Sequence, residues 1–459
     1  MPAFSRSEVV AALSHALDLT EGQVEGHAGR TCVLGLRMAE DLGVPQADRA
    51  ALYYALLLKD SGCSSSAARM SQIFGTDDLT LKRTGKLVDW TRPSKALRWV
   101  AGSLADAGGL LNARHTLRVA LEFARDDVVV DARCERGAKI VADLGFPPSA
   151  AETVRCLDEH WDGKGRPRRM SGEEIPLLAR IACLSQTAEV FITTLGRPAA
   201  RRMVRKRRGR WFDPAVADAF LRIPDDDPVW ERFDEAHDPL VVAEMEPHGD
   251  HEEAHDGHLD RIAEAFAQVI DAKSSYTFNH STAVAEYAVA VGRALGEPEE
   301  GLRRLRRAGL LHDIGKLGVS SAILDKPGRL TDEEYAQIRL HARYTEEILG
   351  RISLLAEIAP VAASHHERMD GGGYHRGLRG EAIPEGGRIL AVADVFDALT
   401  ANRPYRDGMS VADALMIMRK DRGTAFWDRA LDALCDIAHD LPPRGTASGP
   451  ARVPRATAA

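Results

Sequence analysis

The sequence predicts an all-α protein built from two related halves. Apolar residues recur three and four positions apart through most of the chain, as they do on the buried face of a helix. No stretch alternates apolar and polar residues for long, so strands are not expected. Motifs of the first half return in the same order in the second half, which indicates the duplication of one helical domain.

The apolar spacing of the first half predicts a succession of helices. The first helical pattern covers residues 7–42 and is interrupted at residues 18–22. Further helices are expected over residues 48–59, 95–107, 115–125, 133–144, 150–158 and 177–194. Residues 199–210 are rich in Arg and Lys, and we expect a solvated loop there in preference to an anion-binding segment.

Four segments are expected along the chain. Residues 1–222 form a degenerate copy of the domain, and residues 259–440 form the intact copy. Residues 223–258 are rich in Asp, Glu, Pro and His, which indicates an exposed acidic linker. Residues 441–459 have little to bury, and we expect them to be disordered.

Composition limits the classes of function. The 459 residues are 44% hydrophobic and 28% charged, as in an ordinary soluble protein of two or three domains. The net charge of -8 argues against a general nucleic-acid binder. No apolar run is long enough to span a membrane, and residues 1–20 lack the pattern of a signal peptide. The six scattered cysteines are expected to be reduced thiols, so we expect a cytoplasmic protein.

The second half carries His and Asp at the ends of apolar helical runs. His312 and Asp313 follow such a run directly, and the others are His280, His341, His365, His366 and Asp394. An isolated His-Asp pair would indicate only a buried histidine. Five His and two Asp exceed the needs of one metal and suit two divalent ions about 3.5–4 Å apart. Imidazole and carboxylate donors without thiolate favour Fe or Mn, and Zn, Ni and Co are also compatible.

These residues also resemble a known family. Together with Lys316 and the segments 365–367 and 370–374 (Asp-Gly-Gly-Gly-Tyr), they resemble the HD-GYP family of cyclic dinucleotide phosphodiesterases, a branch of the HD phosphohydrolase superfamily. The resemblance runs from about Tyr276 to Trp427. It implies hydrolysis of cyclic di-GMP to pGpG, with onward cleavage to GMP left open, through a hydroxide that bridges the two metals.

The resemblance also implies a role for each site residue. Asp313 would bridge the metals and act in catalysis with Lys316, which would stabilise charge that develops on the phosphate. Glu367 would orient the neighbouring histidines from outside the ligand set. The cyclic dinucleotide would contact Gly372, Gly373, Tyr374, Arg403 and Arg406.

Two positions depart from the family pattern. His375 stands where the family usually has proline, so the loop loses a fixed φ and is expected to be more mobile. Tyr276 stands where members with a third metal carry Glu. We therefore expect two metals.

The first half has lost most of the metal-ligating residues. His27 and Asp60 persist, but the expected positions of His312 and His341 hold Lys59 and Cys134. The His pair becomes Leu157-Asp158, and Asp394 becomes Gln186. A protonated Lys has no lone pair for a metal, so this copy is expected to be catalytically silent. We expect His27 to be a buried, hydrogen-bonded histidine and the copy to be a scaffold in preference to a regulatory nucleotide site.

Other functions remain open at this point. The chain could hydrolyse another cyclic dinucleotide, such as a cyclic GMP-AMP, or another nucleotide. It could also be a non-catalytic nucleotide sensor or scaffold that acts through protein partners such as a diguanylate cyclase. Pairing of the two halves could imitate a dimer, so both a monomer and a dimer are compatible with the sequence.

Overall fold

The computed structural model describes residues 6–106, 116, 119, 127–247, 256–274, 279–326, 328–402 and 407–441. Over these residues the chain is helical, and three isolated bridges are the only extended pairings among them. The predicted all-α fold is therefore confirmed. In the part of the chain that the structure describes, no helix combines the length and the apolar character needed to cross a bilayer.

The first half contains the helices that the apolar spacing predicts, and several more. They are α1 (Arg6–Thr20), α2 (His27–Asp41), α3 (Gln46–Leu58), η1 (Cys63–Ser66), α4 (Ala67–Phe74), α5 (Asp78–Gly85), α6 (Pro93–Asp106), α8 (Asp127–Asp143), α9 (Pro148–Cys156), η2 (Gly172–Glu174), α10 (Leu177–Leu195), α11 (Arg197–Arg207) and α12 (Pro214–Arg222). The expected helix over residues 115–125 lies almost wholly outside the described residues.

Two segments differ from the sequence-based expectation. The basic segment 199–210 is mostly helical in α11, where Arg207 is buried and its guanidinium lies 3.8 Å from the centre of the Trp211 ring. The expected linker forms α13 (Val229–Glu235) and α14 (Pro239–Ala243), which pack on α2 and α1. Trp230 and Phe233 are buried there, so apolar side chains hold this segment to the first half in spite of its acidic composition. Of the five histidines of the expected linker, His237 and His258 lie among the described residues.

The second half repeats this helical arrangement. Its elements are α15 (Asp256–Asp271), α16 (His280–Leu295), α17 (Glu299–Leu311), η3 (Ile314–Gly318), α18 (Ser321–Leu324), α19 (Asp332–Gly350), α20 (Ala359–Ala363), η4 (Gly380–Ala382), α21 (Glu385–Thr400), α22 (Val411–Met418), η5 (Arg419–Asp421) and α23 (Asp428–Ile437). The expected tail lies outside the described residues, except for Leu441.

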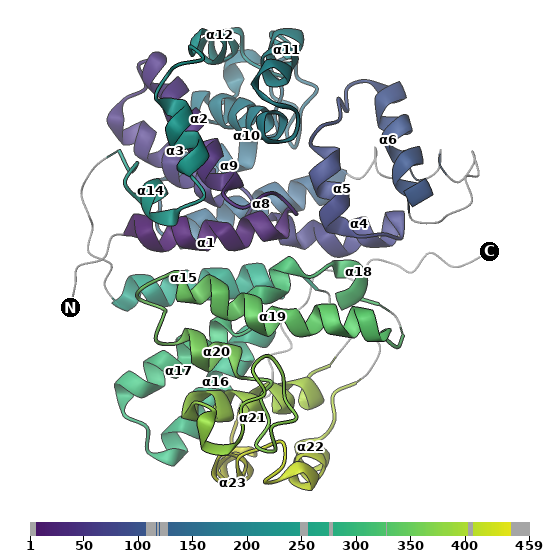
Figure 1. Cartoon of the computed structure of the whole chain (residues 1–459), viewed down its shortest axis with the longest axis vertical. Coiled ribbons are helices and arrows are strands. Elements are labelled where there is room, and N and C mark those ends of the chain that lie inside the picture. Colours follow the sequence, from purple (N-terminus) through teal and green to yellow (C-terminus); the bar gives the residue numbers. More distant parts are fainter. Residues whose placement is uncertain are drawn as a thin grey trace.

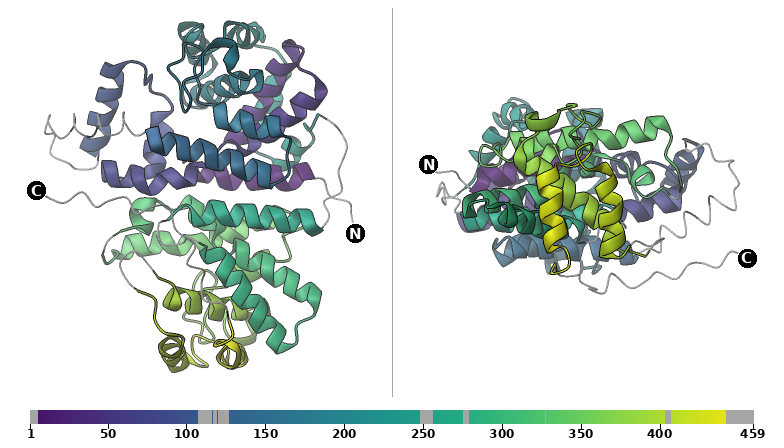
Figure 2. Two further views of the ribbon diagram at one scale, coloured as in Figure 1. Left: turned by 180° about the vertical axis from the view of Figure 1, so that it is seen from behind. Right: turned by 90° about the horizontal axis from the view of Figure 1, so that it is seen from below.

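The two halves stack face to face through their long helices (Figure 1). Helix α1 of the first half contacts η3 and α19, while α15 of the second half contacts η1 and α8. The view from behind shows α15 running beside the first half along the same seam (Figure 2). Buried apolar residues of both halves belong to one continuous core, so the seam is part of the folded interior.

A buried ion pair also crosses the seam. Lys273 of the second half donates to Asp78 of α5 at 3.0 Å, and neither side chain is exposed. The other oxygen of Asp78 accepts the backbone N–H of Ser321 at 2.7 Å, at the start of α18. Because a buried charge must keep its partners, this contact ties the two halves in one register.

Equivalent contacts recur in both halves. Asp18 accepts the backbone N–H of Ala28 at 2.9 Å, and Asp271 accepts that of Ser281 at 3.2 Å, one residue after the corresponding histidines. Isolated parallel bridges join residues 208 and 212 in the first half and residues 422 and 426 in the second. The duplication inferred from sequence therefore extends to details of hydrogen bonding.

Candidate metal centre

Close packing of α16 and α17 brings the first ligands together. A Cβ at Gly309 would lie 2.7 Å from Cα of Ala285, so only glycine allows this approach. Helix α17 then ends at Leu311 and His312 follows it directly, while His280 begins α16. Asp271 holds the start of α16 through the N–H and hydroxyl of Ser281. The two histidine rings are 5.2 Å apart between centroids.

Asp313 lies at the middle of the cluster and is completely buried. Its Oδ2 is 3.6 Å from Nε2 of His280 and 3.3 Å from Nε2 of His312. Its Oδ1 is 3.5 Å from Nε2 of His341 and 3.6 Å from Nε2 of His365. Each oxygen therefore faces a different pair of imidazoles, as expected of a carboxylate that bridges two ions.

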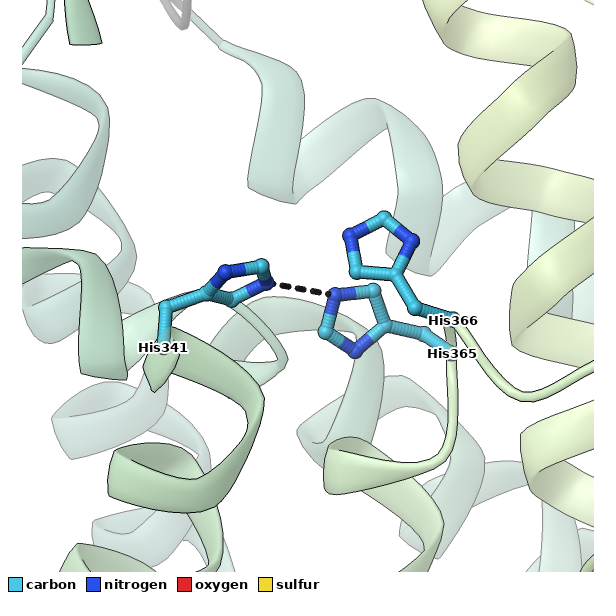
Figure 3. Close-up of side chains that lie close together, drawn as sticks. All are labelled: His341, His365 and His366. Carbon is cyan, nitrogen blue, oxygen red and sulfur yellow. Dashed lines mark hydrogen bonds between the residues drawn. The ribbon is translucent and has the colours of Figure 1, made fainter. Parts of the chain in front are cut away.

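The remaining predicted residues complete the two groups. Asp394 on α21 has Oδ1 3.3 Å from Nε2 of His280 and Oδ2 3.9 Å from Nδ1 of His366. His341 on α19 points at the pair that follows α20, and its Nε2 is 3.2 Å from that of His365 (Figure 3). The potential ligand atoms of His280, His312 and Asp394 lie within 4.8 Å of one another, and so do those of His341, His365 and His366. All seven predicted ligands thus meet at one place.

The imidazoles are oriented from outside the cluster through Nδ1. His312, His341 and His365 each donate Nδ1–H to a backbone carbonyl three residues earlier, at 2.7, 2.6 and 2.6 Å. Nδ1 of His280 pairs with Asp397 Oδ2 at 2.7 Å. With Nδ1 carrying the proton, a neutral ring presents its Nε2 lone pair to the centre, which is the orientation typical of metal-ligating histidines.

This donor set fits divalent metals. Nε2 of His312 and Oδ1 of Asp313 are buried and have no hydrogen-bond partner. In their neutral forms, His341 and His365 turn two lone pairs toward each other across 3.2 Å, an arrangement that a shared cation stabilises. Two donors on one ion at bond lengths of about 2.0–2.2 Å lie roughly 3–3.5 Å apart, so the observed spacings leave room for ions after small adjustments.

The electrostatics of the site also favour cations. Burial raises the pKa of Asp313, but Lys316 and the imidazoles outweigh it and hold that pKa well below its usual range. Burial and its neighbours lower the pKa of His341 to about 3, which keeps the ring neutral. Burial also lowers the pKa of His280, but Asp313, Asp394 and Asp397 raise it well above its usual value. Without another cation, the carboxylates therefore recruit a proton to His280.

Lys316 and the glycine loop border the cluster. Lys316 on η3 forms an ion pair with Asp313, and its side chain is 20% exposed. The Tyr374 ring lies 4.7 Å from the ring of His366 between centroids. A Cβ at Gly373 would lie 2.6 Å from the backbone N of Arg368, so this glycine lets the loop fold back on its own start. Arg403 and Arg406 lie outside the described residues.

Glu367 has a different role from the one expected. Its carboxylate accepts the backbone N–H of Arg376 at 2.7 Å and of Leu378 at 2.9 Å, and no hydrogen bond to a histidine ring is found among the described residues. In the first half Glu159 accepts the N–H of Arg168 and Met170 in the same way. Glu367 therefore closes the loop, and the histidines are oriented by the carbonyls and Asp397.

In the first half, cationic side chains stand where the second half gathers ligands. Lys59 forms an ion pair with Asp60, and Lys86 lies 3.6 Å from the other oxygen of Asp60. The predicted burial of His27 is confirmed, and its Nδ1 pairs with Glu189, the counterpart of Asp397. Glu21, Asp60 and Cys63 are close enough to hold a metal, but the two ammonium groups already neutralise their charge.

The structure corrects one assignment between the halves. A Cβ at Gly315 would lie 2.0 Å from the carbonyl oxygen of His341, and one at Gly62 would lie 2.0 Å from that of Arg133. Arg133, and not Cys134, therefore occupies the place of His341. It forms an ion pair with Asp158, which occupies the place of His366. The positively charged Arg133 thus takes the place of a predicted metal ligand, as Lys59 does at the place of His312.

Asp397 and Asp271 were not predicted from the sequence. Asp397 follows Asp394 by three residues and so lies on the same face of α21, a spacing that could have identified it. Asp271 precedes His280 by nine residues and acts through the start of a helix, for which the sequence holds no short-range signal.

Comparison with known proteins adds independent findings. A family model described as HD domain matches residues 80–216 and 264–431. The chain is 38% identical over 443 residues to 3′3′-cGAMP-specific phosphodiesterase 3 of Vibrio cholerae, covering 96% of each chain. It resembles the crystal structure of the cyclic GMP-AMP specific phosphodiesterase V-cGAP3 of that organism, with a TM-score of 0.65 and 33% identity over 96% of this chain and 99% of the other. It is also 40% identical over 170 residues, 37% of this chain and 45% of the relative, to the cyclic di-GMP phosphodiesterase response regulator RpfG of Xanthomonas campestris.

Proposed function

Because the chain belongs to the HD-GYP family of cyclic dinucleotide phosphodiesterases, which are metal-dependent hydrolases, we propose that it hydrolyses a cyclic dinucleotide at the cluster around Asp313. The observation that carries this proposal is the position of Asp313, whose two oxygens face two separate groups of imidazoles. Such a site suits two ions that act together on a phosphodiester.

We propose 3′3′-cyclic GMP-AMP as the first substrate to test. The relative named as specific for 3′3′-cGAMP matches 96% of this chain, including the silent first half. The relative named for cyclic di-GMP matches 37% of it. Cyclic di-GMP, the substrate favoured by the sequence, is therefore the second candidate, with pGpG and then GMP as its expected products.

The chain's own residues prepare the site. Divalent ions, when bound, supply Lewis-acid charge and lower the pKa of a water molecule. His280, His312, Asp313 and Asp394 would hold one ion, and His341, His365 and His366 would share Asp313 around the other. The protein fixes four of these five histidines through their Nδ1 contacts and keeps Asp313 and Asp394 charged. Fe or Mn remains the expected metal.

Lys316 would place a positive charge beside the reacting phosphate. It already neutralises Asp313 and is partly exposed at the edge of the cluster. An ammonium group in a sheltered site stabilises negative charge that grows on a phosphate oxygen in the transition state. Tyr374, beside His366, would meet the substrate from the side of the glycine loop.

We assign the first half a structural role. Its ion pairs replace the metals with lysine and arginine cations, so it needs no ion to neutralise its buried carboxylates. The first half packs behind η3 through α1, and η3 follows Asp313 directly. We therefore expect it to support the catalytic segment from behind.

A competition assay tests the proposed substrate. Mn- or Fe-loaded protein receives equal amounts of 3′3′-cyclic GMP-AMP and cyclic di-GMP, and both products are followed by chromatography. We expect faster loss of 3′3′-cyclic GMP-AMP. Preferential loss of cyclic di-GMP would reverse the order of the two candidates, and no loss of either would refute the proposed substrate class.

A further inference from the structure

Helix α19 holds the glycine loop as well as supplying His341. Glu346, five residues after His341, accepts a hydrogen bond from Nε2 of His375 at 2.6 Å. The same carboxylate forms an ion pair with Arg376. The side chains of Glu346 and His375 are 19% and 14% exposed, so water competes little for this contact.

The backbone at His375 explains why the loop needs such a contact. Its φ is 139°, a region that side-chain-bearing residues rarely adopt and that proline, fixed near −65°, cannot reach. The greater mobility expected of this loop after loss of proline stays a prediction. A hydrogen bond from His375 and an ion pair from Arg376 to Glu346 of α19 hold the loop, where the family usually has a proline ring.

A second contact joins α19 to the loop nearer the metal cluster. The guanidinium carbon of Arg339 lies 4.7 Å from the centre of the Tyr374 ring, within the range of a cation–π interaction. Arg339 is exposed, and no carboxylate pairs with it among the described residues. Tyr374 also lies beside His366. The Arg339 guanidinium therefore lies at the edge of the proposed catalytic site, where its N–H groups can donate to a ligand.

Comparison of the two halves distinguishes residues that both halves share from residues that occur only beside the metal cluster. The loop-closing glutamate and the close-packed glycines occur in both halves, as Glu159 and Glu367, Gly62 and Gly315, and Gly165 and Gly373. Of the five residues that join α19 to the loop, only Arg376 has an identical counterpart, Arg168, and the other four are not repeated. When Arg133 is aligned with His341, the first half has Asp131 at the position of Arg339 and Ala138 at that of Glu346. It has Arg166 at the position of Tyr374 and Pro167 at that of His375. These contacts occur only in the half with the metal cluster.

From this arrangement we propose that α19 and the glycine loop form the substrate-binding wall of the metal centre. Glu346 is a positioning residue that sets the loop through His375 and Arg376. Arg339 is a substrate contact that binds a phosphate of the cyclic dinucleotide beside Tyr374. This inference rests on the proposed function and adds two binding determinants to it.

The test uses Glu346→Ala and Arg339→Ala in the full chain, with Glu347→Ala and Arg343→Ala as controls. Glu347 and Arg343 are exposed neighbours on α19 that pair with each other at 2.8 Å. Each variant is assayed with 3′3′-cyclic GMP-AMP and with bis(p-nitrophenyl) phosphate, a small diester without bases, after its metal content has been counted. Hydrogen exchange of residues 369–380 reports on the loop independently of any substrate.

We expect Glu346→Ala to lower kcat/KM for the cyclic dinucleotide roughly 10- to 100-fold, and Arg339→Ala to raise its KM about 10-fold. Metal content should stay near that of the controls, and the losses on the small diester should be smaller than those on the cyclic dinucleotide. Loop exchange should quicken in Glu346→Ala and not in Glu347→Ala.

Unchanged loop exchange in Glu346→Ala would overturn the positioning role, and equal losses on both substrates would show an effect on the metals instead. An unchanged KM in Arg339→Ala would overturn the proposed contact. If the wild-type protein hydrolyses the diester but no cyclic dinucleotide, the proposed function and the phosphate contact both fail. The exchange experiment still decides whether Glu346 holds the loop.

Discussion

Asp397→Asn tests whether the cluster is a metal centre oriented from outside its ligands. Asp397 Oδ2 lies 2.7 Å from Nδ1 of His280, and both side chains are buried. The substitution keeps the shape but exchanges a charged acceptor for a neutral amide, which lowers the basicity of the ring. Loss of such a partner typically weakens metal affinity 10- to 100-fold, or about 1.4–2.7 kcal/mol.

The assay is a titration of metal-free protein with Mn²⁺, followed by spin resonance or calorimetry, beside turnover at saturating metal. Glu189→Gln is the matched control because Glu189 holds His27 in the first half as Asp397 holds His280. We expect weaker Mn²⁺ binding in Asp397→Asn only. Unchanged affinity in Asp397→Asn, or an equal loss in Glu189→Gln, would refute the reasoning.

Three further predictions concern the catalytic residues and the seam. The double substitution of His312→Ala and Asp313→Ala should abolish hydrolysis and metal binding, and an active double variant would contradict the proposed site. Asp60→Asn, in the first half, should keep turnover and lower the melting temperature. Lys316→Met should lower kcat roughly 100- to 1000-fold with metal content retained, and a change confined to KM would argue against its role. Burial lowers the pKa of Lys273 from 10.5 to about 8, so the unfolded chain binds more protons than the folded chain between these values. The unfolding free energy should therefore rise across that pH range relative to Lys273→Met, and parallel pH profiles would contradict the assignment.

The sequence indicated the proposed ligands because their chemistry is distinctive. His312-Asp313 and the His365-His366 pair interrupt apolar runs, and few structural roles require so many imidazoles. Asp397 is equally buried, but a lone Asp on an apolar helix is also common in ordinary cores. Its contact with His280 depends on two helices far apart in the sequence, which spacing alone does not specify.

The first half shows a different limit of sequence reasoning. The sequence indicated lost ligands at Lys59 and Cys134, and it did not show that the charges of Lys59 and Arg133 compensate Asp60 and Asp158. The sequence also did not fix which residue of α8 corresponds to His341, and it suggested Cys134. The contact of Gly62 with the Arg133 backbone sets that correspondence, and such a contact is visible only in three dimensions.

The most direct test of the account is a count of metal per chain together with turnover of cyclic dinucleotides. We predict about two metals per chain and hydrolysis of 3′3′-cyclic GMP-AMP or cyclic di-GMP, with both lost in the His312→Ala and Asp313→Ala double variant. Metal retained by the double variant, or two bound metals without turnover of either dinucleotide, would contradict the claim that this cluster is the single catalytic centre.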